Sequence, residues 1–136
     1  MATRDLHNSI KVEPSINPAA ALTANGTTTG LTIDGDGYES VEHVLQSGAI
    51  TDGTFTAQLW AGDAANMSDE AQVSAAGDLL GTVPAFAATD DNVVKRVGYR
   101  GSKRYSRIKV VQAGATTGGF LSATAVKGHP HVAPVA

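Results

Sequence analysis

Carboxylates and glycines at residues 34–39 are the first candidates for chemistry, because Asp34, Asp36 and Glu39 resemble the ligands of a calcium loop. An EF-hand loop beginning at Asp34 requires Gly at its sixth position and Glu at its twelfth. The chain has Glu39 and Leu45 at those positions, so an EF-hand is excluded. Asp-Gly pairs favour tight turns with positive φ, and a hairpin turn is therefore preferred over a looser Ca²⁺ site.

Two other segments match a ligand-binding motif only in part. Residues 114–119 have the glycine spacing of a phosphate loop, but Phe120 and Leu121 occupy the positions where Lys and Ser or Thr bind phosphate and Mg²⁺. His129 and His131 flank a proline and supply at most two ligands, whereas a zinc site needs at least three protein groups. We therefore predict that residues 114–119 form a turn and that the tail with His129 and His131 is a contact segment. We expect no metal and no cofactor.

No residue pattern singles out a catalytic nucleophile. The sequence has no Gly-x-Ser-x-Gly motif and no cysteine, and its four histidines and 13 acidic residues show no spacing that marks a base and its orienting partner. Catalytic triads assemble in space from residues that are distant in sequence, so the lack of a spacing pattern disfavours an enzyme without excluding one. We expect a protein that is not an enzyme.

A basic run between residues 95 and 109 is the pattern that points to nucleic acid. Clustered Lys and Arg bind phosphate, and the interleaved Tyr99 and Tyr105 offer stacking surfaces. Strand alternation would send these side chains to opposite faces, however, and the sequence pI is about 5.7. We therefore expect contact with an acidic protein surface rather than with nucleic acid.

Charge is divided unevenly along the chain. Residues 1–94 contain all 13 acidic residues and only two basic ones, and residues 95–136 contain eight basic residues and no acidic one. The two parts meet either between neighbouring subunits, where complementary charge steers association, or inside one subunit. The second arrangement is favoured because a compact β fold pairs segments that are distant in sequence.

The elements that must position these residues are predicted to be short strands joined by tight turns, since the chain is rich in glycine and poor in aromatic residues. Residues 54–60 alternate most clearly, with Phe55, Ala57 and Leu59 on one face. Residues 62–81 predict a loop with at most one or two helical turns. The pattern predicts an all-β single β-sandwich, jelly-roll-like or immunoglobulin-like, of about eight short strands. These strands are expected at residues 10–12, 30–33, 39–47, 54–60, 78–87, 92–99, 104–112 and 119–127, with the second and third forming a hairpin.

Prolines mark both ends of the chain as extended segments. Pro14 and Pro18 exclude a regular helix from residues 1–20, which we expect to form an N-terminal arm held by a neighbouring molecule. Residues 21–128 then form the sandwich domain, and residues 129–136 form a C-terminal tail. The polar N-terminus and the lack of an apolar stretch of about 20 residues predict neither a signal peptide nor a membrane span.

A succession of segments along the whole chain, rather than any single motif, carries a resemblance to a known family. The segments are Asp5-Leu6-His7-Asn8 with Ile10-Lys11-Val12, Gly37-Tyr38-Glu39-Ser40, Gly62-Asp63-Ala64-Ala65-Asn66 with Ser68-Asp69, Asp78-Leu79-Leu80-Gly81, Asp91-Asn92, Gly98-Tyr99, Lys103-Arg104-Tyr105 and Gly128-His129-Pro130-His131. In this succession the chain resembles the small head decoration, or cement, proteins and head spike base proteins of tailed bacteriophages and gene-transfer-agent-like elements.

This resemblance implies a β-sandwich subunit that attaches to the outer surface of a capsid. Its expected partners are the major capsid protein and copies of itself, in a trimer or pentamer, with no membrane and no nucleic acid. Its expected location is the virion, after synthesis in the bacterial host cytoplasm. Two alternatives stay open: a vertex ring or head spike base that carries a host-binding fibre or spike protein, and a carbohydrate-binding module with Trp60, Tyr38 and Tyr99 as its stacking platform.

Assembly contacts are expected in the arm, in the basic turn and in the tail, because many weak contacts reinforce one another on a symmetric array of sites. No residue is assigned a catalytic role. The predicted contact residues are Arg4, Asp5, Leu6, His7 and Asn8 in the arm, Arg100, Lys103 and Arg104 in the basic turn, and His129 and His131 in the tail.

Overall fold

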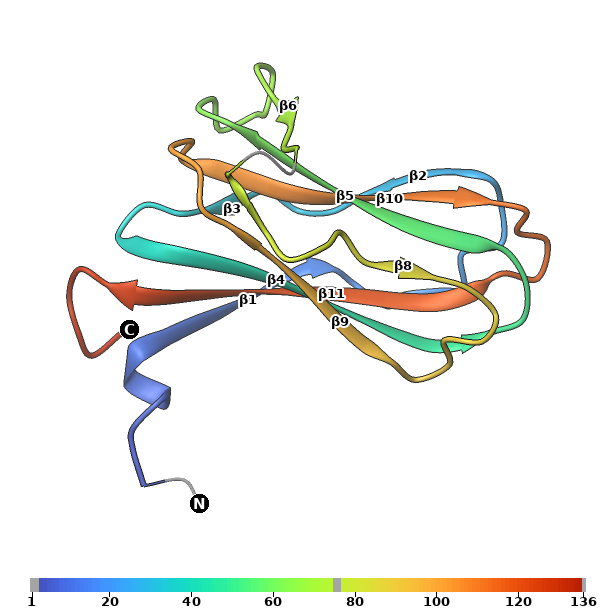
Figure 1. Cartoon of the computed structure of the whole chain (residues 1–136), viewed down its shortest axis with the longest axis horizontal. Helices are drawn as coiled ribbons and strands as arrows, with labels where there is room; N and C mark the ends of the chain where they lie inside the picture. Colours follow the sequence, from blue (N-terminus) through green and yellow to red (C-terminus); the bar gives the residue numbers. More distant parts are fainter. Residues whose placement is uncertain (1–2, 75–76, 136) are drawn as a thin grey trace.

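Two antiparallel sheets packed face to face make up the protein (Figure 1), so the predicted β-sandwich is confirmed. The structure, a computed structural model, describes residues 3–74 and 77–135. It contains the 3-10 helix η1 (His7–Ser9) and the strands β1 (Ile10–Ile16), β2 (Gly26–Thr29), β3 (Ile33–Asp34), β4 (Tyr38–Ile50), β5 (Thr54–Gly62), β6 (Ala71–Gln72), β7 (Leu79–Leu80), β8 (Ala85–Phe86), β9 (Val94–Tyr99), β10 (Tyr105–Ala113) and β11 (Gly119–Pro130).

The two sheets draw their strands from distant parts of the chain. The five-stranded sheet has the order β1-β11-β4-β9-β7. The six-stranded sheet has the order β2-β10-β5-β6, with β3 also paired to β10 and β8 also paired to β5. No helix among the described residues is long and apolar enough to cross a membrane.

Side chains alternate between the core and the outer surface along the long strands. In β5, Phe55, Ala57 and Leu59 are at most 1% exposed, while the residues between them lie on the outer face. In β10, Ile108 and Val110 are buried in the same way. The predicted alternation of residues 54–60 is therefore confirmed, and it fixes which faces of these two strands meet the opposite sheet.

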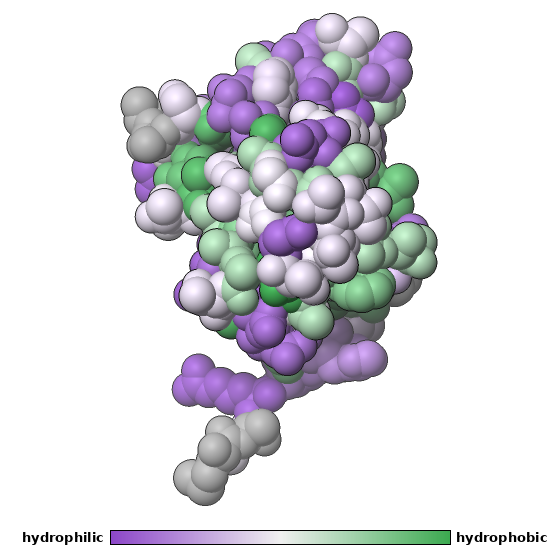
Figure 2. Space-filling model, turned by 90° about the vertical axis from the view of Figure 1, so that its right-hand side faces the viewer, coloured by the Kyte–Doolittle hydropathy of each residue, from purple (hydrophilic) through white to green (hydrophobic). Residues whose placement is uncertain are grey.

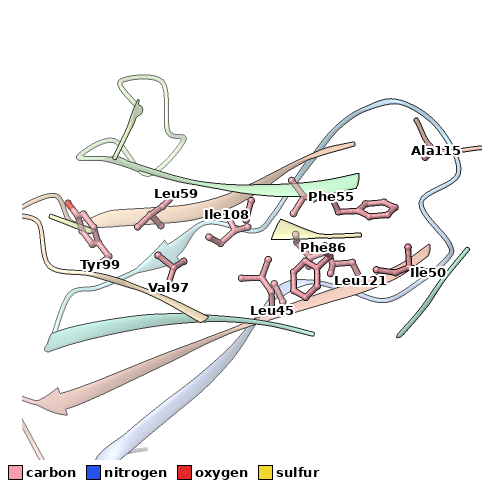
Figure 3. Close-up of a cluster of buried hydrophobic side chains, with 14 of the residues drawn as sticks. Leu45, Ile50, Phe55, Leu59, Phe86, Val97, Tyr99, Ile108, Ala115 and Leu121 are labelled. Atoms are coloured by element: carbon pink, nitrogen blue, oxygen red, sulfur yellow. The ribbon is translucent and has the colours of Figure 1, made fainter. Parts of the chain in front are cut away.

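The apolar core lies between the sheets (Figure 3), where Leu45, Phe55, Leu59, Phe86 and Ile108 are almost fully buried. Burying a side chain of this size contributes about 1.5–3 kcal/mol each. The core therefore fixes the two sheets relative to each other and positions the loops at both ends.

The predicted hairpin between residues 30–33 and 39–47 is wrong. Strand β3 pairs with β10 in the six-stranded sheet, whereas β4 lies between β11 and β9 in the other sheet. The turn between β3 and β4 has the expected local chemistry, since the Asp36 backbone N–H donates to Asp34 Oδ1 (3.0 Å) and Gly37 has φ +86°. This turn carries the chain from one sheet to the other, because β3 pairs with β10 in the six-stranded sheet and β4 pairs with β11 and β9 in the five-stranded sheet.

The predicted strand at residues 78–87 is also wrong as a single element. It consists of β7 in the five-stranded sheet and β8 in the six-stranded sheet, separated by Gly81 with φ +85° and by Pro84. In the predicted loop at 62–81, the described residues include β6 and no helix, and residues 75 and 76 lie outside the described part of the chain.

The first twenty residues differ in part from the extended arm that the prolines predict. Strand β1 pairs with β11 from Ile10 to Ile16, with an irregularity between Pro14 and Ile16. Pro14 fits because β1 is an edge strand, where one side of the backbone needs no partner. Strand β1 contains the strand expected at residues 10–12, which is thereby confirmed and continues to Ile16. The division into arm, sandwich and tail stays a prediction. At the other terminus, β11 continues to Pro130, which lies opposite Tyr38.

Candidate interaction site

The arm, the basic turn and the tail, which are far apart in sequence, lie at the same end of the sandwich (Figure 1, left). The backbone N–H of Val135 donates to the Asn8 carbonyl oxygen (3.0 Å), and that of His131 donates to the Gly37 carbonyl oxygen (2.9 Å). We call residues 3–9, 35–41, 99–104 and 129–135 the arm end. The turns at 51–53, 88–92 and 114–118 form the opposite loop end.

The described part of the arm stands clear of the sandwich body as a hydrophilic projection (Figure 2, purple, below the body). All five predicted contact residues of the arm are exposed, and Leu6 keeps 65% of its surface accessible. Asp5 accepts hydrogen bonds from the Asn8 backbone N–H (3.1 Å) and from Asn8 Nδ2 (2.6 Å), which together lower the pKa of Asp5. The arm is thus locally ordered and free on its outer side.

A cleft of about 500 Å³ opens at the arm end between the turn at 35–37 and the loop at 100–104. The residues that line it include the predicted contact residues Arg100, Lys103, Arg104 and His131. A second hollow of about 310 Å³, lined by residues that include Tyr38, Pro130 and Val132, lies beside the tail. The structure therefore brings the basic turn and the tail together around the first cleft, whereas the second hollow is lined by the tail and not by the basic turn.

Two of the predicted cations are already paired within the chain. Arg104 donates from Nε (2.9 Å) and Nη2 (2.8 Å) to the two carboxylate oxygens of Asp34, which raises the pKa of Arg104. Lys103 Nζ lies 2.6 Å from Asp63 Oδ2, and this contact raises the pKa of Lys103 and lowers that of Asp63. Arg100 differs, because its Nε donates to the Gly77 carbonyl oxygen (3.2 Å) and no carboxylate lies within ion-pair distance among the described residues.

The two predicted histidines of the tail bind the start of β4. His129 Nδ1 lies 2.9 Å from Ser40 Oγ, and His131 Nε2 is hydrogen-bonded to Glu39 Oε1. Both residues are exposed, so these contacts hold the tail against the sandwich without burying it. The histidines therefore order the tail and leave its outer surface accessible.

The acidic and basic parts of the chain meet inside one subunit, as the sequence favoured. Besides the pairs at the arm end, Glu70 accepts from Arg107 (2.7 Å to each oxygen) and from Lys109 Nζ (2.5 Å) on the outer face of the six-stranded sheet. These contacts lower the pKa of Glu70. Much of the charge that a partner would otherwise use is compensated within the chain.

Polar side chains that no sequence motif marks are buried between the sheets beneath the arm end. His43 in β4 is fully buried, and its Nε2 lies 3.0 Å from Ser106 Oγ in the opposite sheet. Its Nδ1 has no hydrogen-bond partner among the described residues. Burial lowers the pKa of His43 to about 4, so the ring is neutral near pH 7.

Lys127 is the second buried polar group, with only 4% of its surface exposed. Its Nζ donates to Glu13 Oε1 (2.9 Å) and to the Asp34 carbonyl oxygen (3.0 Å), and it lies 4.6 Å from the centre of the Tyr38 ring. Alternation along β11 was the available signal, because Lys127 shares the inward face with Ala125. The interior beneath the arm end is therefore partly ionic.

Neither the carboxylates that could bind calcium nor the aromatic residues that could stack on a glycan come together in one site. Among residues 3–74 and 77–135, no cluster of three or more His, Asp or Glu side chains is arranged to hold a metal. Tyr38 and Tyr99 both line the cleft, but Tyr99 is only 7% exposed and packs against Gly101. Trp60 lies on the outer face of the six-stranded sheet, with Lys109 Nζ 4.1 Å from its ring centre.

Comparisons with known proteins give no family for this chain. No family model matches it, and no curated protein matches it. A crystal structure of PirA is similar over 95% of this chain and 100% of that chain, at 10% identity and a TM-score of 0.40. A structure of the Gx strain of infectious bursal disease virus is similar over 88% of this chain, which spans 32% of that chain, at 14% identity and a TM-score of 0.44. Neither likeness is strong enough to bear on function.

Proposed function

We propose that this chain is a structural protein of a tailed-phage virion, a decoration subunit that binds the outer surface of the capsid through its arm end. It acts by contact, without a catalytic centre or a cofactor, and its partners are the major capsid protein and copies of itself. The proposal rests on the resemblance along the sequence and on one structural observation. That observation is the gathering of the arm, the basic turn and the tail at one end of a rigid sandwich.

The charges at the arm end indicate how such contact is made. Lys103 and Arg104 are held by their own carboxylates, so they position the cleft more than they attract a partner. Arg100 and the exposed arm, with Arg4 and Leu6, are the groups that remain open to a capsid surface. We therefore assign the main attachment to the arm and to Arg100, and a supporting role to the rest of the predicted set.

A vertex ring or spike base would use the same end and the same partners, and it differs in copy number. Subunits that decorate the whole shell outnumber a vertex protein, because a vertex protein is limited to the fivefold sites of the shell. Stoichiometry in purified particles distinguishes the two. The carbohydrate-binding alternative is less favoured, because its three aromatic residues do not form one stacking surface: Trp60 does not line the cleft that contains Tyr38 and Tyr99.

The test is attachment to heads produced without this protein by the phage that encodes it. A variant lacking residues 1–8 keeps β1, which begins at Ile10, and is expected to stay folded while losing most of its head binding. A matched control, Thr117→Arg, changes an exposed residue at the loop end and should bind like the wild type. Head binding by the shortened chain at the wild-type level would overturn the assignment of attachment to the arm.

A further inference from the structure

The outer face of the five-stranded sheet carries large apolar side chains that stay exposed. Val12 (56%), Leu80 (46%), Val94 (57%) and Phe120 (48%) come from four different strands of this one sheet. The strand register places Val12, Val126, Glu42, Gly98 and Leu80 in one row across all five strands. An added Cβ at Gly98 would meet both Glu42 and Leu80, which confirms that their side chains share this face.

The remaining positions of this face are mainly apolar or small. Val44 and Val126 are half-buried within it, and Phe120 lies over Gly48, where an added Cβ would be 3.1 Å from Phe120 Cβ. From β1 to β7 the face spans four strand spacings of about 4.8 Å, and residues 120–126 extend about 20 Å along β11. Its area is on the order of 400 Å², less than the roughly 800 Å² per partner of a standard stable interface. A contact through this face is therefore weak on its own and grows at high local concentration.

The outer face of the six-stranded sheet has the opposite character. Trp60 is covered by Lys109, and Arg107 and Lys109 both bind Glu70, so its large and charged groups have partners within the chain. The side chains of Arg107 and Lys109 keep less than 20% of their surface exposed. Among the described residues, the uncovered apolar surface of the sandwich therefore lies mainly on the five-stranded sheet.

One ion pair of loose geometry lies within the apolar face. Arg96 Nη1 is 3.7 Å from Glu42 Oε1, and the Arg96 side chain is 76% exposed. Burial raises the pKa of Glu42, and Arg96 offsets this effect only in part. A face that carries one charge of each sign complements itself: in a two-fold pair, Arg96 of each copy meets Glu42 of the other. A partner of uniform charge would place a like charge against one of the two.

We propose that two copies of this chain pack their five-stranded sheets face to face about a two-fold axis, with reciprocal Arg96 to Glu42 contacts surrounded by Val12, Leu80 and Val94. This inference stands independently of the capsid assignment, because it concerns a side face and not the arm end. It predicts a dimer in place of the trimer or pentamer that the resemblance implies.

Sedimentation equilibrium over a wide range of protein concentration tests the dimer. The wild type is expected to fit a monomer–dimer equilibrium, and Val94→Glu should raise the dissociation constant at least about tenfold, because a charge would enter the apolar contact. Leu31→Glu is the matched control, since Leu31 is 51% exposed but lies outside the sheet face. A wild type that stays monomeric at the highest concentration, a trimer or pentamer, or an equal loss in the Leu31→Glu control would each overturn the proposal.

A charge exchange tests the reciprocal geometry without depending on apolar burial. Glu42→Lys and Arg96→Glu each place like charges opposite each other in a two-fold pair, so each variant alone should dimerise more weakly than the wild type. In a mixed dimer, the new lysine of the first variant meets the new glutamate of the second, and the unchanged Arg96 and Glu42 meet as in the wild type. The mixture should therefore associate with near wild-type affinity. Failure of the mixture to recover association, with both variants folded by circular dichroism, would refute the two-fold arrangement.

Discussion

The two ends of the sandwich fill the space between the same two sheets with different chemistry. Towards the loop end, Phe55, Phe86 and Leu121 form a purely apolar part of the core (Figure 3). Beneath the arm end, the same layer also contains His43 and Lys127 with their polar partners. The difference indicates that the arm end accommodates buried polar and charged groups beneath the surface we assign to binding, whereas the interior towards the loop end does not.

The surfaces of the two ends also differ, because polar groups are paired within the chain at the loop end and are more open at the arm end. At the loop end, Asp52 accepts hydrogen bonds from the backbone N–H groups of Thr116 (3.0 Å), Thr117 (3.1 Å) and Gly118 (2.7 Å), and these bonds lower its pKa strongly. The loop at 114–118 is thereby closed on itself. At the arm end, the arm projects from the body and Arg100 has no carboxylate partner among the described residues.

The largest expected effect is at the apolar core. Phe55→Ala removes a side chain that is 1% exposed, and it should lower the free energy of unfolding by about 3–5 kcal/mol through lost burial and a residual cavity. Val132→Ala at the arm end, where Val132 is 77% exposed, should change it by less than about 0.5 kcal/mol. Urea denaturation measures both, and similar losses in the two variants would contradict the difference between the ends.

The second effect is a pH dependence that comes from the arm end. The pKa of His43 falls from its ordinary 6.5 to about 4 on folding, so the unfolded chain binds the extra proton between these values. The contribution of His43 to the free energy of unfolding is therefore complete above about pH 6.5. This free energy should fall by up to about 3 kcal/mol as the pH drops to 4.

His43→Gln isolates this effect, because glutamine does not titrate and can still bond Ser106. Between pH 4.5 and 7, denaturation midpoints should fall towards acidic pH in the wild type and in His131→Gln, and this fall should be lost in His43→Gln. The raised pKa of Glu42 acts in the opposite direction, because it makes the folded chain bind the extra proton. The carboxylates with lowered pKa values lose their contribution only at lower pH, which keeps the two effects apart. A slope that persists in His43→Gln would show that another group is responsible.

A smaller effect is expected for the buried ion pair at the arm end. Glu13→Gln leaves the Lys127 ammonium 4% exposed with only a backbone carbonyl and an aromatic ring as partners, which should cost about 2 kcal/mol, less than for a fully buried pair because Glu13 is partly exposed. Glu39→Gln breaks the exposed contact with His131 and should cost less than about 0.5 kcal/mol. Thermal and urea unfolding compare the two, and equal costs would show that burial does not set the strength of these pairs.

The long strands could be predicted from the sequence because their alternation is local. Phe55, Ala57 and Leu59 are separated by polar residues, and this pattern alone assigns their face. The change of sheet after Asp34 could not be predicted, since a turn sequence does not specify which sheet its next strand joins. Alternation along β11 places Lys127 on the inward face with Ala125, but its ion pair with Glu13 could not be predicted, because Glu13 lies 114 residues away in sequence.

The sequence indicated which segments make up the candidate site, but not how the charged groups in it are paired. The sequence singled out the arm, the basic turn and the tail, and their role as contacts stays a prediction. Their convergence at one end follows from pairings among β1, β4 and β11 that only the fold specifies. The sequence also placed Lys103 and Arg104 among the binding groups. Their carboxylate partners, Asp63 and Asp34, are distant in sequence and become neighbours through the folded sheets.

A further stability effect is expected at the surface of the loop end. Asp52→Asn weakens the bonds that close the loop at 114–118, and differential scanning calorimetry should show a lowered melting temperature. Head binding should not change, because this loop lies at the end opposite the arm. A loss of head binding in this variant, with the fold retained, would contradict the assignment of attachment to the arm end.

The most direct test of the proposed capsid role is electron cryo-microscopy of virus particles purified from the source that encodes this chain. We expect density for the sandwich on the outer surface of the shell, with residues 3–9 and the loop at 100–104 facing the capsid protein and Asp52 facing outward. Particles that lack this protein, or that present the loop end to the shell, would contradict it.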